Sequence, residues 1–144
     1  MPPRTAEVIA VGSELLGTTR TDTNSLYLSG RLSSIGVDLR IKSVVGDDRG
    51  DLETIFRQAI TRADVVVLTG GLGPTDDDLT RESVAAVLGI AMHEDEAIVT
   101  KIRTRFERRG LTMPAVNRRQ AQVPAGAIVL DNPNGTAPGL FIEP

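Results

Sequence analysis

The most informative segment of this sequence is Val65-Val66-Val67-Leu68-Thr69-Gly70-Gly71-Leu72-Gly73-Pro74-Thr75. Its first half is a continuous β-branched run, which is typical of a parallel strand buried on both faces. Its second half is a glycine-rich loop, which ends the strand and leads into a helical pattern that stops at Gly89. A strand, a glycine loop and a helix in this order predict one unit of a parallel α/β sheet.

The same alternation of strand and helix occupies the sequence on both sides of this segment. Strands are predicted over residues 7–11 and 37–45. The helix between them begins at Asp22 or Thr23 and carries an apolar face, formed by Leu26, Leu28, Leu32 and Ile35. A second helix, capped by Asp51, shows the clearest helical periodicity and precedes the strand at 65–68. Further on, helices are predicted over 79–89 and 95–109, and strands over 127–130 and 139–142. The order predicts an α/β fold with three layers, α/β/α, and a mostly parallel central sheet.

Composition excludes several classes of protein. The 144 residues suit one domain, and a net charge of −3 with 3% aromatic residues argues against binding to nucleic acid or to an anionic membrane. The chain has no cysteine and one histidine, His93, which removes thiolate chemistry and zinc or iron–sulfur sites based on these residues. With no long apolar run and no signal peptide at the start of this sequence, a cytoplasmic location is expected.

Glycines and carboxylates follow each of the three expected parallel strands, at the sheet edge where such folds bind ligands. They are Gly12 and Glu14, with Asn24 further on, after the first strand; Asp47 and Asp48 after the second; and the glycine loop with Asp76, Asp77 and Asp78 after the third, with Arg81 next along the helix. Glycines let backbone N–H groups approach a phosphate closely. Carboxylates beside a phosphate require a bridging hard cation, such as Mg²⁺ or Mn²⁺.

Each of these residues also has a simpler interpretation. The glycine loop is neither a Walker A loop nor a dinucleotide fingerprint, and it would make a tight turn even without a ligand. At least one of the three consecutive aspartates is expected to cap a helix, and Asp48 is expected to be solvated. The basic residues near the end of the 95–109 helix are also expected to be solvated, namely Arg103, Arg105, Arg108 and Arg109. Arg118 and Arg119 lie in a segment that resembles a loop, where a cation could face a phosphate.

Seven motifs, in order along the chain, resemble the amino-terminal domain of the competence/damage-inducible CinA family, within the wider group of molybdopterin-binding domains. They are Gly12-Ser13-Glu14-Leu15-Leu16-Gly17, Asp22-Thr23-Asn24-Ser25, Val45-Gly46-Asp47-Asp48, the loop Thr69–Thr75, Asp77-Asp78-Leu79-Thr80-Arg81-Glu82, Asn117-Arg118-Arg119-Gln120-Ala121 and Asn134-Gly135-Thr136-Ala137-Pro138-Gly139. The resemblance runs from Glu7 to Ile142. The sequence Leu72-Gly73-Pro74-Thr75 is more similar to the CinA branch than to the pterin branch.

The resemblance implies a metal-dependent pyrophosphatase that converts ADP-ribose to AMP and ribose 5-phosphate. Two alternatives are a non-catalytic module that binds a pterin or nucleotide, and a molybdopterin adenylyltransferase. The cofactor would be Mg²⁺, Mn²⁺ or Co²⁺, with K⁺ as a further ion, and the protein would form a homo-oligomer. The catalytic candidates are Asp47, Asp78, Arg81 and Arg119, and the metal candidates are Asp47, Asp77 and Asp78. The ligand-binding candidates are Gly12, Glu14, Asn24, Thr69, Gly70, Gly71, Gly73, Thr75 and Asn117.

Two departures from the family pattern accompany this resemblance. Members of the CinA family usually continue into a nicotinamide-nucleotide amidase domain, and their first domain usually includes a further Leu-Pro-Gly-rich segment. Neither is found between Met1 and Pro144. The 144 residues are therefore expected to be a single domain of this type, trimmed at its carboxyl end.

Overall fold

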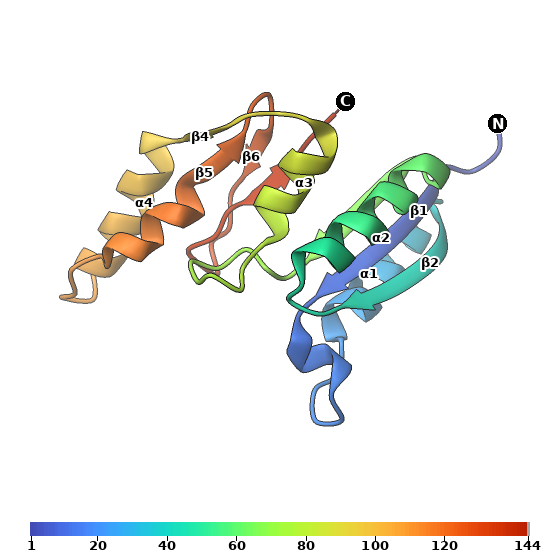
Figure 1. The fold of residues 1–144 in the computed structure, drawn as a ribbon, viewed down its shortest axis with the longest axis horizontal. Helices are drawn as coiled ribbons and strands as arrows, with labels where there is room; N and C mark the ends of the chain where they lie inside the picture. The colour runs from blue at the N-terminus through green and yellow to red at the C-terminus, as the bar shows by residue number, and fades with distance from the viewer. Residues whose placement is uncertain (144) are drawn as a thin grey trace. The chain divides into compact units, whose positions relative to one another are not determined.

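The computed structural model describes residues 1–143, and the chain forms two compact units that divide between Gly71 and Leu72. Each unit has its own helices and its own sheet pairing (Figure 1). The division falls inside the glycine loop that the sequence singles out. The two units are described in turn.

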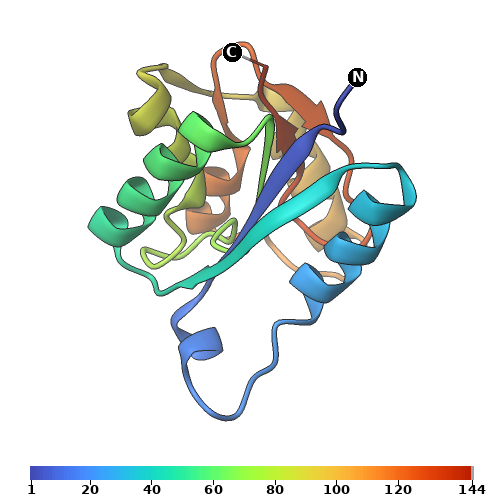
Figure 2. The same cartoon turned by 90° about the vertical axis from the view of Figure 1, so that its right-hand side faces the viewer.

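The first unit contains a three-stranded parallel sheet with the strand order β2-β1-β3. Its elements are β1 (Thr5–Val11), a short 3₁₀ helix η1 (Ser13–Leu16), α1 (Thr23–Ser34), β2 (Asp38–Val45), α2 (Arg49–Arg62) and β3 (Val65–Thr69). Figure 2 shows α1, in light blue, and α2, in green, on opposite sides of β1 and β2. The predicted α/β class, with a parallel sheet between layers of helix, is confirmed.

The strand order explains this layering. The chain leaves β1 toward one neighbour, β2, and returns across β1 to reach β3. Since crossover connections between parallel strands are right-handed, the two helices must lie on opposite faces of the sheet. The central strand is therefore β1, which is buried from Ala6 to Val11. The predicted burial of the 65–68 strand on both faces is wrong, because β3 lies at the edge of this sheet and Val65 is 39% exposed.

A buried carboxylate joins the central strand to α2. Glu7 is 2% exposed, and its Oε1 and Oε2 accept hydrogen bonds from Arg62 Nε (2.5 Å) and Nη2 (3.0 Å). A carboxylate removed from water needs such a partner, because an unpaired buried charge is strongly destabilising. The pair also raises the pKa of Arg62, mainly through the hydrogen bond to Glu7. Glu7 thus fits within an otherwise apolar strand.

Two helix predictions in the first unit require correction. Asp22 caps α1 as expected, but α2 is capped by Asp48, whose Oδ1 accepts a hydrogen bond from Asp51 N at 2.8 Å. Asp51 therefore lies in the first turn, and Asp48 has a defined structural role. In α1 the predicted apolar face is only partly right, since Leu26 is 69% exposed and Ile35 70% exposed. The inward face includes Ser25 instead.

The second unit begins at Leu72 and is built from short elements. They are α3 (Thr80–Leu88), β4 (Met92–Glu94), α4 (Glu96–Glu107), η2 (Ala115–Ala121), β5 (Gln122–Pro124), β6 (Ile128–Leu130) and β7 (Gly139–Phe141). Antiparallel pairs form between β4 and β5 and between β6 and β7. Its buried core consists of Ile98, Val99, Ile102, Ala121 and Val123. No helix within residues 1–143 has the length and apolar character needed to span a membrane.

The structure confirms the two helices and the two carboxyl-terminal strands predicted for this unit. It adds β4 and β5, which the sequence does not reveal because a three-residue strand has too little alternation to be recognised. The segment around Asn117, expected to be irregular, is the 3₁₀ helix η2.

A close backbone contact ends the parallel sheet of the first unit. Gly70 has φ +86°, and a Cβ atom placed there would lie 2.2 Å from the carbonyl oxygen of Val11. Only glycine satisfies both conditions without strain. The contact lies at the carboxyl ends of β1 and β3, between which the direction of winding reverses, and this is the usual ligand position in doubly wound sheets.

We predict that Gly70→Ala destabilises the protein much more than Gly36→Ala does. Gly36 also has a positive φ of +77°, but nothing lies within 4 Å of a Cβ placed there. Gly36→Ala, the control, should lower the free energy of unfolding by about 1 kcal/mol, because alanine disfavours a positive φ. Gly70→Ala adds a clash with the Val11 backbone and should lower it by at least about 3 kcal/mol. Urea unfolding of both variants measures the difference, and equal losses would contradict the proposed close contact.

Candidate functional site

The carboxyl edge of the first unit's sheet is held together by backbone and side-chain hydrogen bonds between loops. Gly12 N donates to Val45 O at 2.9 Å, which continues the pairing of β1 and β2 beyond the strands. Ser13 and Asp47 then bond reciprocally, with Ser13 N donating to Asp47 Oδ2 (3.1 Å) and Asp47 N donating to Ser13 Oγ (2.8 Å). The loops after β1 and β2 are therefore brought together, as the sequence predicts.

This arrangement uses only half of the Asp47 carboxylate. Oδ2 is occupied by Ser13, whereas Oδ1 accepts no hydrogen bond from any residue in the described range 1–143. The side chain is half-buried and oriented by its partner. A carboxylate with one positioned and one open oxygen can bind a cation without a large loss of side-chain freedom. Ser13 was not among the predicted site residues, although its position directly after a strand-ending glycine is a signal that could have identified it.

The other predicted residues of the first unit differ in how they are placed. The Glu14 carboxylate lies close over Gly12, since a Cβ at Gly12 would be 2.6 Å from Glu14 Oε2. Thr69 is the last residue of β3, and Gly70 and Gly71 follow with positive φ. Asn24 is exposed in the first turn of α1. The structure thus places Gly12, Glu14 and Asp47 at one edge.

In the second unit the Asp78 carboxylate closes the glycine loop on itself. Its Oδ2 accepts hydrogen bonds from Thr75 N (2.9 Å) and Thr75 Oγ1 (2.7 Å), and Gly73 leaves room for it, because a Cβ there would lie 2.5 Å from the same oxygen. Burial acts to raise the pKa of Asp78, but the hydrogen bonds from Thr75 and Gly73 and the charge of Arg81 outweigh it, so this pKa lies below its ordinary value. Asp78 is not a helix cap, since α3 is preceded by Leu79 without a side-chain cap.

Arg81 is buried and binds the backbone of this loop. It is 2% exposed, and it donates from Nη1 to Leu72 O (2.6 Å) and from Nη2 to Gly73 O (3.0 Å). Its Nε is buried without a hydrogen-bond partner among the described residues. A guanidinium group is a rigid fork of donors, which suits it to hold two successive carbonyl groups in one orientation. These contacts favour a loop-positioning role over the predicted contact with the transition state.

Arg119, from η2, binds the next part of the same loop. It donates from Nη1 to Thr75 O (2.7 Å) and to Asp76 Oδ1 (3.0 Å), and its Nε donates to Glu82 Oε1 at 3.2 Å. Three carbonyl groups of the loop are therefore bound by arginines. Neither guanidinium group is free in this structure to approach a phosphate, and the predicted catalytic role of both arginines stays a prediction.

The remaining candidates divide into buried and exposed residues. Asn117 is buried, and its Nδ2 donates to Gln120 Oε1 (3.0 Å), while Gln120 Nε2 donates to Thr136 Oγ1 (2.9 Å). This chain of bonds connects η2 to the turn between β6 and β7, so Asn117 has a structural function here. Asp77 is exposed and makes no hydrogen bond within residues 1–143.

The carboxylates described above fit a metal site completed by water and substrate better than a site built from protein ligands alone. No group of three or more His, Cys, Asp or Glu side chains is arranged to hold a metal among the described residues. A cage built entirely from protein is therefore not present there. The open oxygen of Asp47, in the first unit, fits the manner in which Mg²⁺ is usually held, by one or two carboxylates with water and substrate oxygens completing the shell. The exposed carboxylate of Asp77, in the second unit, has the same donor chemistry.

Comparison with known proteins agrees with this architecture. Residues 7–143 match the family model described as a probable molybdopterin binding domain. A CinA-like protein from Koribacter versatilis is 51% identical over 138 residues, which cover 96% of this chain but 33% of the relative. The chain thus spans about a third of the length of the curated relatives it matches.

Solved structures show the same relationship. The crystal structure of the protein CinA from Thermoplasma acidophilum, described as having unknown function, has a TM-score of 0.86 and 34% identity, with 97% of this chain and 82% of that chain covered. The molybdopterin biosynthesis enzyme MoaB from Thermus thermophilus shares the fold at a TM-score of 0.55 and 17% identity, with coverage of 84% and 79%. The chain therefore belongs to the family of probable molybdopterin binding domains, with CinA-like proteins as its relatives.

Proposed function

We propose that this protein is a divalent-metal-dependent hydrolase acting on the pyrophosphate of ADP-ribose, with AMP and ribose 5-phosphate as products. The observation that carries the proposal is the half-engaged Asp47 carboxylate at the carboxyl edge of the parallel sheet, next to the Gly12 backbone. A single oriented carboxylate oxygen beside glycine backbone is suited to a phosphate that arrives with a hard cation.

Each group has a defined part in this chemistry. A bound divalent cation would polarise the phosphate and favour deprotonation of a water molecule. Asp47 would hold that cation through Oδ1 in the first unit, and Asp77 and Asp78 remain metal candidates of the second unit. The backbone N–H groups of Gly70 and Gly71 would bind phosphate oxygens, and Gly73, whose N–H group bonds Asp78, would do so only after that bond is exchanged. The water oxygen forms a new P–O bond at one phosphorus as the bridging P–O bond breaks, the bridging oxygen leaves with the other phosphate, and the protons of the water pass to solvent. No Cys, Ser or His nucleophile is required.

The glycine loop supports this assignment through its carbonyl groups. Arg81 and Arg119 bind Leu72 O, Gly73 O and Thr75 O. A peptide whose carbonyl group is held on one side directs its N–H group away from that side, because the peptide unit is planar and trans. Of these three peptides, the one after Thr75 presents the Asp76 N–H group for an anion, whereas the Gly73 N–H group bonds Asp78 and Pro74 has no N–H group. A donor held in advance favours electrostatic stabilisation because it needs no later reorganisation.

Two alternatives from other classes make different predictions. A non-catalytic module would bind a pterin or nucleotide without turnover, and the family description supports it as the second candidate. A molybdopterin adenylyltransferase would consume ATP in the presence of the pterin. Incubation with ADP-ribose and Mn²⁺, followed by a phosphatase, distinguishes the hydrolase from both alternatives. The phosphatase releases inorganic phosphate only from AMP and ribose 5-phosphate, because ADP-ribose has no terminal phosphate.

We predict that Asp47→Asn lowers the turnover of ADP-ribose by at least about a hundredfold, since several kcal/mol of metal-derived stabilisation are lost at about 1.4 kcal/mol per decade. Asp48→Asn is the matched control, because Asn caps a helix nearly as well as Asp and the lost charge is the same. Thermal melts with and without Mn²⁺ and ADP-ribose test binding separately. Full ligand-dependent stabilisation of Asp47→Asn would place the site elsewhere.

Asp78→Asn is expected to lower turnover by a similar factor and also to weaken the loop. Because the pKa of Asp78 is lower in the folded protein, its charge contributes stability above its unfolded pKa, and this contribution disappears as the pH falls through the folded pKa. The difference in unfolding free energy between wild type and Asp78→Asn should therefore be largest near neutral pH and shrink below about pH 4. Urea unfolding at several pH values measures it, and a constant difference would contradict a role for the charge.

Arg81→Lys tests the positioning role. Lysine keeps the charge but cannot bridge two carbonyl groups with one planar fork, so kcat/KM for ADP-ribose should fall about tenfold. Arg118→Lys is the control, since Arg118 pairs with Glu94 and Glu96 and makes no hydrogen bond to the loop. Melting temperatures show whether both variants fold. Unchanged kcat/KM in a folded Arg81→Lys variant would refute the positioning role.

A further inference from the structure

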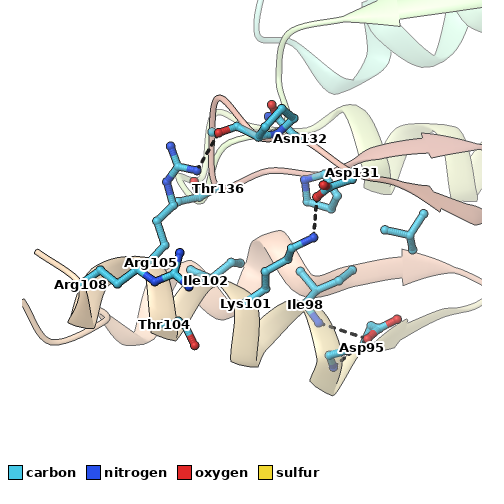
Figure 3. Close-up of a pocket in the computed structure, with 15 residues that line it drawn as sticks. Asp95, Ile98, Lys101, Ile102, Thr104, Arg105, Arg108, Asp131, Asn132 and Thr136 are labelled. Atoms are coloured by element: carbon cyan, nitrogen blue, oxygen red, sulfur yellow. Dashed lines mark hydrogen bonds and ion pairs between the residues drawn. The ribbon is translucent and has the colours of Figure 1, made fainter.

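A cavity of about 570 Å³ lies in the second unit, between α4 and the turn that joins β6 to β7 (Figure 3). This volume is within the range of small-molecule sites, roughly 300–1000 Å³. None of the residues assigned above to phosphate or metal binding lines it. The cavity is therefore a separate feature, and its chemistry can be derived from its own walls.

Three cations from one face of α4 line this cavity. Lys101, Arg105 and Arg108 follow one another at intervals of four and three residues, which places them on the same side of a helix. Figure 3 shows Lys101 and Arg105 reaching from α4 toward the turn. Lys101 Nζ lies 2.5 Å from Asp131 Oδ1, so this pair is neutralised. The other two cations are not neutralised in this way.

Arg105 and Arg108 keep their charge uncompensated. Arg105 Nη1 donates to Pro133 O at 3.2 Å, and a carbonyl oxygen carries no formal charge. Arg108 makes no side-chain hydrogen bond or ion pair within residues 1–143. The remaining carboxylate of the wall is Asp95, whose Oδ1 caps α4 through Ala97 N (2.9 Å) and Ile98 N (3.2 Å). Ten residues of helix, about 15 Å, separate Asp95 from Arg105, so two positive charges dominate one end.

The cavity wall also has an apolar part, beside the polar side chains of Thr104, Asn132 and Thr136. Ile98 and Ile102 contribute from α4, and Val129 and Pro138 contribute from the β6–β7 hairpin. A ligand that matches these walls carries a compact double negative charge at one end and a ring or other apolar surface at the other. Guanidinium groups bind phosphate through parallel N–H···O bonds, which makes a phosphate ester the best match for the charged end.

A simpler explanation accounts for part of this pattern. Basic residues near a helix carboxyl terminus are favoured by the helix dipole, and the sequence led us to expect a solvated helix end. Arg103 and Arg109 fit that expectation, since neither lines the cavity in the described structure. Arg105 and Arg108, from the same helix end, do line it. The dipole explains why all four are basic, but it does not explain the cavity between two of them and an apolar wall.

We propose that this cavity binds a phosphate monoester that carries an apolar ring system, with the phosphate between Arg105 and Arg108 and the ring against Val129 and Pro138. The proposal does not depend on the hydrolase activity proposed above. The probe is AMP, titrated at 0.15 M KCl into ¹⁵N-labelled protein, with adenosine as the ligand that lacks the phosphate. Amide resonances of α4 and of the turn, at Lys101, Arg105, Asn132 and Thr136, report binding at this site.

AMP should shift these resonances and adenosine should not. In the double variant Arg105→Ala/Arg108→Ala, the dissociation constant for AMP should rise about tenfold or more, because two charge-assisted contacts are lost. The charge-matched variant Arg103→Ala/Arg109→Ala should stay within about twofold of wild type, since exposed charges act weakly at this salt concentration. Melting temperatures confirm folding, and Arg108→Ala alone removes a side chain with no hydrogen bond within residues 1–143.

Three outcomes would overturn the proposal. The first is shifts confined to the glycine loop and the carboxyl edge of the parallel sheet, which would assign AMP to the proposed catalytic site alone. The second is an equal loss of affinity in both double variants, which would show a general charge effect. The third is the absence of shifts with AMP at millimolar concentration. Unchanged ADP-ribose hydrolysis in the Asp47→Asn variant, or no hydrolysis by the wild type, would contradict the proposed function and leave the AMP titration at α4 unchanged, so the two proposals fail independently.

Discussion

The close approach of the Gly70 backbone to the carbonyl oxygen of Val11 is the constraint on which the first unit depends. It lies at the ends of β1 and β3, where the chain has just crossed the central strand and must leave the sheet. A side chain at residue 70 would separate these strand ends, and the positive φ would disfavour any residue other than glycine. Because β1 is central and buried, a shift there would disturb both neighbouring strands and the helices that cover them.

At the same edge, hydrogen bonds bring the loops after β1 and β2 into a fixed arrangement. Once β1 and β2 end side by side, Gly12 and Val45 continue the ladder and Ser13 can bond Asp47 in both directions. In the second unit, side chains hold the glycine loop in place. Asp78 closes the loop, and Arg81 and Arg119 bind its carbonyl groups. Backbone geometry organises the loops of the first unit, and charged side chains organise the glycine loop of the second.

Local sequence patterns predicted long elements well and short ones poorly. The repeating periodicity of α2 and the choice between Asp22 and Thr23 as the cap of α1 are strong local signals, and the structure confirms the helix and assigns the cap to Asp22. The sequence predicts Asp51 as the cap of α2, whereas the structure shows Asp48, because both are Asp residues near the helix start and only the end of β2 decides between them. The burial of β3 was overestimated because an apolar run does not reveal whether a strand is central or at an edge.

The sequence by itself determined the α/β class, the order of the long elements, the family and the positions of glycines and carboxylates after the strands. These features depend on residue type and spacing, which act locally. Only the tertiary structure decided what each charged side chain contacts: that Arg81 and Arg119 hold loop carbonyls, that Asp47 keeps one oxygen open, and that Arg105 and Arg108 face a cavity while Arg103 does not. Partners of a long, flexible side chain lie far away in sequence, so their identity depends on how the elements pack.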